Sequence, residues 1–201
     1  MISIQEYLLS KTKKSNSEPT IEANDDNIKS IVEQELQRLG TNADLNHIDT
    51  SKVTNMMFLF RLKRFSGDIS EWDVSNVVSM AGMFQGCIEF NGDLSKWDVS
   101  GVKIMRHMFA SCRDFDGMSI EKWNPKSVQT TEAMFTYCRL FNADISGWRM
   151  PINTDYSHMF DHCKSFSRNL SSWQISKYAR TEMMFRDTPI ARKTSMHPKR
   201  S

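Results

Sequence analysis

The spacing of the tryptophans constrains the fold of this 201-residue chain more than any other feature. Successive tryptophans are 25 or 26 residues apart, at Trp72, Trp97, Trp123, Trp148 and Trp173. A Met-Phe pair begins eleven residues after each of them, and its phenylalanines are Phe84, Phe109, Phe135, Phe160 and Phe185. All four cysteines, Cys87, Cys112, Cys138 and Cys163, follow a tryptophan after 15 residues. Parallel series with one shared interval indicate an internal repeat whose columns are structural and form the core.

Each repeat contains two local patterns. Residues 77–87 place apolar side chains at i, i+3, i+6, i+7 and i+10, the stripe of a short helix facing a core. Residues 90–97 begin with turn residues and then alternate towards Trp97, as an extended segment does. A sixth, degenerate copy precedes the others, because Ile48–Val53 matches Trp72–Val77. Units of about 25 residues must stack to bury their apolar faces. The sequence therefore predicts an α/β repeat solenoid of six strand-plus-short-helix turns.

The segments outside the repeats predict four regions. Residues 24–40 begin with acids, carry an apolar stripe and end at Gly40, which is typical of a helix. We therefore expect a capping helix within residues 21–44, covering the first turn. Residues 1–20 form an N-terminal segment and linker in this scheme, 45–190 the solenoid, and 191–201 a basic, flexible tail.

The charge is unevenly distributed. The chain has a net charge of +2, but residues 186–201 hold five Lys or Arg and one Asp, or +4, which leaves −2 for the rest. This balance disfavours nucleic acid as a partner. No apolar run is long enough for a membrane span, and the N-terminus lacks the pattern of a signal peptide. A cytoplasmic location is therefore expected.

The repeat resembles a known family. Residues 90–112, FNGDLSKWDVSGVKIMRHMFASC, are similar to the repeat of BspA-like leucine-rich repeat proteins, first noted in mycoplasma-type surface lipoproteins. The likeness covers about residues 45–188. The helical segment followed by ADLNHIDTSKVTNM resembles short members from Bacteroides-type bacteria and their phages. The resemblance implies a leucine-rich-repeat-like solenoid with a binding or surface role, on a cell or a virion.

Reactive side chains allow a chemical and a structural interpretation. The cysteine column is best explained as small buried filler, with oxidation under stress or a functional thiol as alternatives. His158 and His162, four residues apart on the expected helix, could share a metal, but no fourth ligand is apparent and solvated histidines on the helix face are the favoured explanation. Asp68, Asp93, Asp144 and Asn169 recur before the strand; they favour side chains that close turns over paired acids or a cation site.

These patterns favour a non-enzymatic binding module without catalytic, metal or cofactor sites, acting on a protein or another macromolecule. A structural component that self-associates through its ends or its N-terminal segment is the alternative, and a metal- or thiol-dependent enzyme is a third. Repeat proteins bind through variable exposed positions. The expected interaction surface is Glu71, Ser95, Lys96, Glu121, Lys122, Ser146, Ser171 and Ser172.

Overall fold

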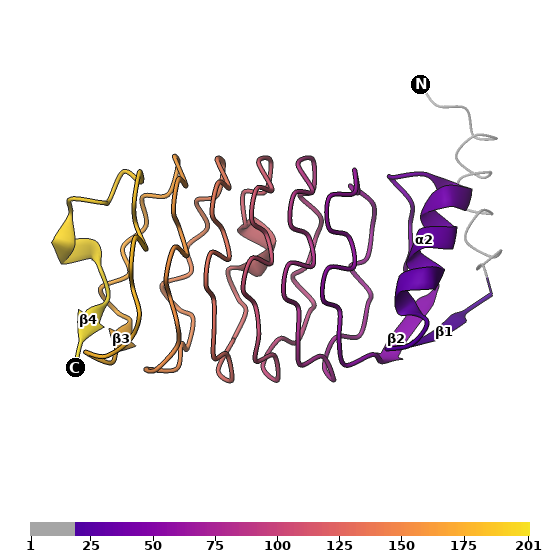
Figure 1. Ribbon diagram of the computed structural model, residues 1–201, viewed down its shortest axis with the longest axis horizontal. Helices are drawn as coiled ribbons and strands as arrows, with labels where there is room; N and C mark the ends of the chain where they lie inside the picture. The colour runs from indigo at the N-terminus through magenta and orange to yellow at the C-terminus, as the bar shows by residue number, and fades with distance from the viewer. Residues whose placement is uncertain (1–18) are drawn as a thin grey trace, which may run out of the picture.

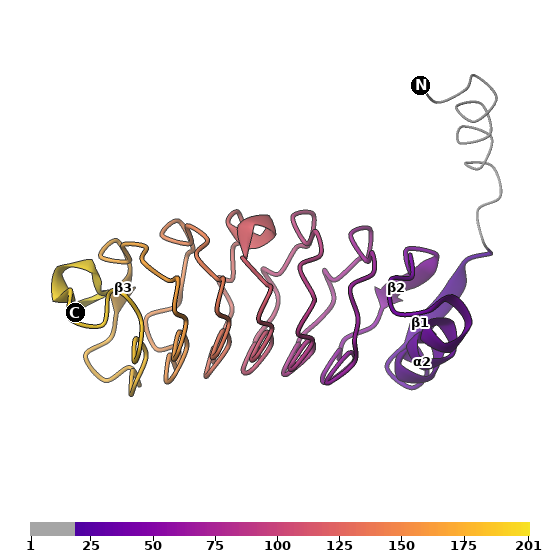
Figure 2. The ribbon, with the colours of Figure 1, turned by 90° about the horizontal axis from the view of Figure 1, so that it is seen from above.

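The computed structural model describes residues 19–201, so nearly all of the N-terminal segment expected over residues 1–20 lies outside it. The molecule is elongated (Figure 1). A helix lies at one end and the C-terminal residues at the other, and loops of chain lie side by side between them. Figure 2 shows the same loops from above, in a single row.

Regular secondary structure is confined to short elements. Strand β1 (Ile21–Asn24) pairs in parallel with β2 (Ile48–Lys52), and helix α2 (Ile28–Leu39) lies between them in sequence. Strand β3 (Gln174–Ile175) pairs in parallel with β4 (Lys199–Arg200). The remaining elements are two 3-10 helices, η1 (Met118–Ile120) and η2 (Thr194–Met196).

The expected α/β solenoid of six leucine-rich-repeat-like strand-plus-helix turns is wrong. Within residues 19–201 there is one α-helix, and the only sheets are the two pairs of strands. Each stretch expected as a helix contains two left-handed residues four positions apart, for example Gly82 (φ 58°) and Gly86 (φ 76°). Such residues interrupt a right-handed helix. The main chain instead forms successive turns, in which an N–H group donates a hydrogen bond to the carbonyl three residues earlier, as Met83 does to Met80.

Six eight-residue segments, here called rungs, replace the expected helices. They are residues 55–62, 79–86, 104–111, 130–137, 155–162 and 180–187, and isolated parallel bridges join the first residues of the first five. The second, fourth, sixth and eighth residues of a rung donate their N–H groups to carbonyls of the next rung. Thus Phe58 donates to Ala81 and Phe60 to Met83. The same four bonds, with N to O distances of 2.8–3.0 Å, occur at each of the five junctions between rungs.

Aromatic columns fill the space behind the rungs. The Phe60 ring and the rings of the five Met-Phe pairs that follow, ending at Phe185, stack in order with centroids 5.4–5.8 Å apart. Each tryptophan Nε1–H donates to a carbonyl of the preceding repeat, as Trp123 does to Leu94 at 2.9 Å. The repeat interval therefore sets both the stacking of the rings and the pairing of the buried indole N–H groups.

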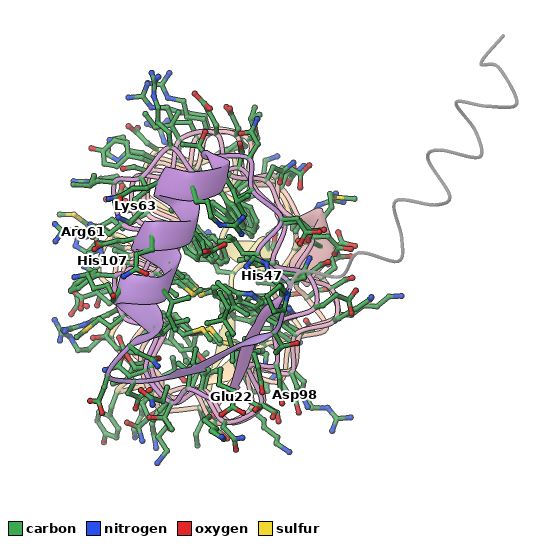
Figure 3. All side chains as sticks on the ribbon, turned by 90° about the vertical axis from the view of Figure 1, so that its right-hand side faces the viewer. Glu22, His47, Arg61, Lys63, Asp98 and His107 are labelled. Carbon is green, nitrogen blue, oxygen red and sulfur yellow. The ribbon has the colours of Figure 1, made fainter. Side chains whose placement is uncertain are left out.

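Helix α2 covers the N-terminal end of the row of rungs, and Figure 3 shows it lying across that face. Ile28 and Val32 on the helix are buried, as is Leu59 on the first rung. Glu33 forms an ion pair with Lys63 at 3.4 Å. Gly40 ends the helix with a φ of 87° and donates its N–H to the Leu36 carbonyl.

Removing one ring from the stack should destabilise the whole row. Phe109 is fully buried and stacks on Phe84, Phe115 and Phe135. We expect Phe109→Ala to lower the free energy of unfolding by ~3–5 kcal/mol, because it leaves a cavity in a packed core. Urea denaturation measures the change. The control is Tyr178→Ala, whose ring is 82% exposed and should shift stability by less than ~0.5 kcal/mol. Equal midpoints for the two variants would contradict the core role of the column.

Candidate functional site

The expected interaction surface is an exposed polar flank of the loops. Four of its eight side chains join one repeat to the next. Glu71 forms an ion pair with Lys96, and Ser172 Oγ donates to the Ser146 carbonyl at 2.9 Å. A carboxylate oxygen of Glu121 accepts the N–H of Asp144 at 2.8 Å. The remaining members are Ser95, Lys122 and Ser171, and all eight residues are exposed or half-buried.

The recurring Asx residues close turns. Asp68, Asp93, Asp144 and Asn169 each accept, through Oδ1, the N–H of the residue two positions later, at 2.9–3.1 Å. Three of these carboxylates, those of Asp68, Asp93 and Asp144, have pKa values below the ordinary value because of bonds from Ser70, Ser95 and Ser146. A site of paired acids would need unengaged carboxylates facing one another, whereas these are each used in a local turn.

The cysteine column is buried and hydrogen bonded. Each thiol donates to the carbonyl of a Phe in the preceding rung, for example Cys112 Sγ to Phe84 at 2.9 Å and Cys138 Sγ to Phe109 at 2.8 Å. All four cysteines are fully buried and none forms a disulfide. Burial raises the pKa of the Cys87 thiol to about 12. The column therefore supplies small side chains whose weak S–H donors satisfy main-chain carbonyls.

His158 and His162 do not lie on a helix, since both have left-handed φ values of 57° and 60°. Both rings instead contact one buried carboxylate, that of Asp161. Nδ1 of His158 lies 3.0 Å from Asp161 Oδ2, and Nδ1 of His162 lies 2.6 Å from Oδ1. Arg186 of the sixth rung also donates to both oxygens of Asp161. Residues 19–201 contain no cluster of three His, Cys, Asp or Glu side chains arranged to hold a metal ion.

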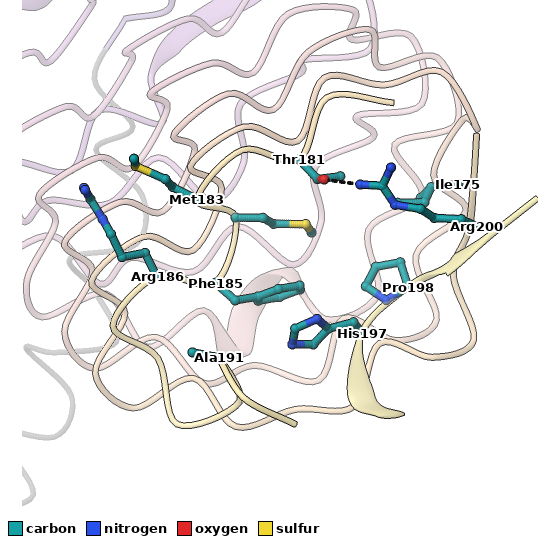
Figure 4. Close-up of a pocket in the computed structure, with 10 residues that line it drawn as sticks. Ile175, Thr181, Met183, Phe185, Arg186, Ala191, His197, Pro198 and Arg200 are labelled. Carbon is teal, nitrogen blue, oxygen red and sulfur yellow. Dashed lines mark hydrogen bonds between the residues drawn. The ribbon is translucent and has the colours of Figure 1, made fainter. Parts of the chain in front are cut away.

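A pocket of about 350 Å³ lies at the C-terminal end of the row (Figure 4). Met184, Phe185 and Ile175 form its apolar lining, and Ala191 and Pro198 belong to the chain that follows. The other lining residues are Thr181, Met183, Arg186, His197 and Arg200. The segment expected as a flexible tail, residues 191–201, contributes to this pocket and pairs through β4 with β3.

Contacts inside the pocket fix its shape. The His197 ring stacks on Phe185 with a centroid distance of 4.3 Å, and its Nε2 lies 2.9 Å from the Ile190 carbonyl. Arg200 donates to Thr181 Oγ1, as the dashed line in Figure 4 marks, and to the Lys177 carbonyl at 3.1 Å. Side chains of the C-terminal segment thus fill one side of the end face and leave the other side hollow.

The C-terminal end also carries unpaired main-chain donors. The second, fourth, sixth and eighth residues of the sixth rung are Thr181, Met183, Phe185 and Asp187, and in the other rungs the N–H groups at these positions donate to the next rung. None of the four donates a hydrogen bond to any group in residues 19–201. The neighbouring N–H groups of Met184 and Arg186 are bonded within the rung, to Thr181 and Met183. Two N–H groups of the sixth rung are therefore bonded within it, and the four that pair with a following rung elsewhere in the row have no acceptor in residues 19–201.

This end is strongly cationic. Residues 177–201 contain seven Lys or Arg, counted from Lys177 to Arg200, against Glu182 and Asp187, which gives a net +5. The sequence did indicate a basic terminus, but it did not indicate the pocket or the open rung. Two features of the sequence mark the end of the repeats. The sixth repeat carries Thr188 in the cysteine column, and Pro198 stands at the repeat interval of 25 residues after Trp173, where another Trp would be expected.

Comparison with known families identifies the chain. The model of the family described as "Mycoplasma protein of unknown function, DUF285" matches residues 27–119 and 117–196. The chain belongs to this family. No curated protein and no solved structure matches this DUF285 chain. In its described residues, no helix combines the length and apolar character that crossing a membrane requires.

The Asp161 cluster should make the stability of this DUF285 chain depend on pH. Burial alone would raise the pKa of Asp161, but hydrogen bonds from Arg186, His158 and His162 lower it by more. The pKa of Asp161 therefore lies below the ordinary 3.8. The stabilisation is therefore present above pH ~4 and is lost as the pH falls through the folded-state pKa. We expect Asp161→Asn to cost about 2 kcal/mol at pH 7. The cost should shrink below pH 4, as urea unfolding at several pH values measures.

Asp187→Asn is the matched control, because Asp187 contacts the same His162 ring but is 53% exposed. It should change the free energy of unfolding by less than ~0.5 kcal/mol. An Asp161→Asn variant with the same loss at pH 3 and pH 7 would show that the carboxylate charge is not the source of the effect.

The thiols of this DUF285 chain should not react in the folded protein. Burial raises the pKa of every cysteine in the column and denies access to reagents. We expect no labelling by iodoacetamide at pH 8 in buffer and four labels per chain in 6 M guanidinium, measured by mass spectrometry. Rapid labelling of any of the four under native conditions would contradict their place in the core.

Proposed function

We propose that this chain is a non-enzymatic binding module that takes a polypeptide partner at the C-terminal end of its row of rungs. The observation that carries the proposal is the pocket between Phe185 and the C-terminal segment. Pockets with an apolar lining and a few polar groups are the usual places where proteins bind other molecules. Phe185 is 8% exposed there, whereas the rings of the same column in the five preceding rungs are fully buried.

Other surfaces offer less to a partner. The polar flank uses half of its side chains, Glu71 and Lys96 among them, to connect its own repeats. A second hollow of about 320 Å³ lies near α2, but its polar residues Glu35, Arg38 and His47 are bonded to one another. The C-terminal pocket combines an apolar floor with a cationic rim, which favours a partner that carries both an apolar and an acidic group.

The lack of an enzymatic role is part of the proposal. The nucleophilic thiols are buried and protonated at neutral pH, and the two adjacent histidines are held by Asp161. A catalytic nucleophile needs an accessible, activated group and a base within reach. The buried thiols and the histidines held by Asp161 support binding rather than catalysis.

The second candidate is a structural component that assembles through its ends. It is favoured by one observation: the first rung presents carbonyls of Asn55, Met57, Leu59 and Arg61 that accept no hydrogen bond from residues 19–201. Those carbonyls would complement the open N–H groups of a second copy, but α2 covers that end.

The recurring phrase of the repeat is the sole basis for two narrower proposals. One is kinship with BspA-like proteins of Bacteroides-type bacteria and phages, and the other is a surface or virion location.

A random peptide library displayed on phage and selected on the immobilised protein tests the binding function. Enriched peptides should bind wild type and lose at least about tenfold in affinity to Ala191→Trp, because the indole fills the pocket. Ser95→Trp, on the exposed flank, is the matched control and should bind as wild type does. Peptides that depend on Ser95 and not on Ala191 would move the site to the flank, and the absence of enriched peptides would overturn the function.

A further inference from the structure

The main-chain pattern at the C-terminal end is incomplete in a specific way. At all five junctions the second, fourth, sixth and eighth N–H groups of a rung donate to main-chain carbonyls. In the last rung the same groups, from Thr181 to Asp187, have no acceptor within residues 19–201. The C-terminal segment covers the end elsewhere, where β4 pairs with β3. The unpaired donors are thus a continuous edge of four, beside the pocket.

An edge of alternate N–H groups fits a polypeptide main chain better than an isolated ion. Carbonyls of a chain recur at a fixed interval, as they do in the rungs, and strand addition to an exposed edge is a common mode of peptide recognition. The edge also has a fixed direction, because parallel bridges join the first five rungs and the sixth is bonded to the fifth in the same pattern. A segment that docks on it should therefore run parallel to the sixth rung.

Resting on the binding function proposed above, we infer that the sixth rung takes an acidic polypeptide segment as a seventh rung. Alternate carbonyls of the partner accept hydrogen bonds from Thr181, Met183, Phe185 and Asp187. An aromatic side chain of the partner enters the pocket and stacks on Phe185. Acidic side chains on either side of it approach Arg180 and Arg186.

The ring stack supports the aromatic residue. Rings in successive rungs lie 5.4–5.8 Å apart, whereas the two phenylalanines within a repeat lie closer, as Phe160 and Phe166 do at 4.2 Å. His197 lies 4.3 Å from Phe185, the distance of a partner within a repeat. His197 therefore takes the place of a second ring within the sixth repeat. It does not take the place that the ring of a seventh rung would have along the column.

The junction between the fifth and sixth rungs supports the acidic residues. Asp155, first in its rung, forms an ion pair with Arg180 at 3.2 Å. Asp161, seventh in its rung, binds Arg186. A partner with acids in the same two places would meet the same two arginines from the other side, within the net +5 of this end.

A second copy of the chain fits this edge poorly. Two C-terminal ends brought together would face N–H groups with N–H groups and +5 with +5. A head-to-tail arrangement would require the carbonyls of the first rung, which lie under α2 with its buried Ile28 and Val32. The observations therefore favour a different polypeptide over self-association.

The fifth rung provides a defined probe. The synthetic peptide of residues 153–162, NTDYSHMFDH, carries Asp155, Phe160 and Asp161 in the required places. Its own carbonyls already bind an equivalent edge, that of the fourth rung. Hydrogen exchange of the full chain, read residue by residue by NMR with the peptide at millimolar concentration, tests the inference.

We expect the amides of Thr181, Met183, Phe185 and Asp187 to exchange fast in the free protein and to slow at least about tenfold with the peptide. Met184 and Arg186, already bonded, should change little, so protection should alternate along the rung. A peptide with both aspartates replaced by lysine is the control and should give no protection. Absence of protection with the acidic peptide, or protection without alternation, would overturn the inference.

A main-chain substitution separates hydrogen bonding from side-chain packing. Cys163 allows the full chain to be assembled by ligation of residues 1–162 to synthetic 163–201, with an ester in place of the amide N–H of Phe185. This variant should bind the peptide about fivefold more weakly. The matched control is an ester at Ser172, which lies on the polar flank and whose N–H donates to no group within residues 19–201. Equal affinities for the two esters would overturn the inference.

The two proposals fail in different ways. Suppose that display-selected peptides depend on Ala191 but do not protect alternate amides of the sixth rung. That result would overturn the addition of a seventh rung and leave the binding function standing. Alternating protection by a peptide of 153–162 that persists in Ala191→Trp would support the edge and remove the pocket from the function. A dimer in light scattering that the acidic peptide does not dissociate would overturn the choice of partner.

Discussion

The hydrogen bonds between rungs are the interaction on which the rest of the structure depends. Four main-chain bonds of 2.8–3.0 Å at every junction hold consecutive rungs in one register. That register brings the phenylalanine rings into stacks and places each tryptophan Nε1–H and cysteine thiol against a carbonyl of the preceding repeat. A buried indole or thiol in any other register would lose its acceptor, so the polar bonds and the apolar packing select the same alignment.

The period and the core columns could be predicted from the sequence because both depend only on which side chains must be buried at a common interval. Trp72 and Phe84 are buried as expected, and so are the other members of their columns. The local conformation could not be predicted. An apolar stripe at i, i+3 and i+7 suits a helix, but it equally suits a series of turns. Left-handed backbone at residues such as His107, Tyr137 and Leu62 has no sequence signal, because glycine occupies these positions only in the second rung.

The candidate site was missed for a different reason. Sequence reasoning looks for residues that vary or could react, and it led to the flank around Lys96 and to His158 and His162. The C-terminal site instead arises because no seventh rung follows the sixth within residues 19–201, and its donors are main-chain groups that no residue type reveals. Its side chains are ordinary ones, such as Met183 and Thr181. Only the hydrogen-bond pattern distinguishes them from the same positions in the middle of the row.

The two ends of the row differ because a directional ladder must end in donors on one side and acceptors on the other. Helix α2 closes the acceptor end with apolar side chains and an ion pair. The C-terminal segment closes only the half of the donor end that faces β3, and Arg180 and Arg186 remain beside the open half. Unpaired N–H groups and cationic side chains at one place attract the same kind of group, one with carbonyl and carboxylate oxygens. One closed end and one charged, open end are the two features from which we propose a partner of opposite polarity rather than a second copy of the chain.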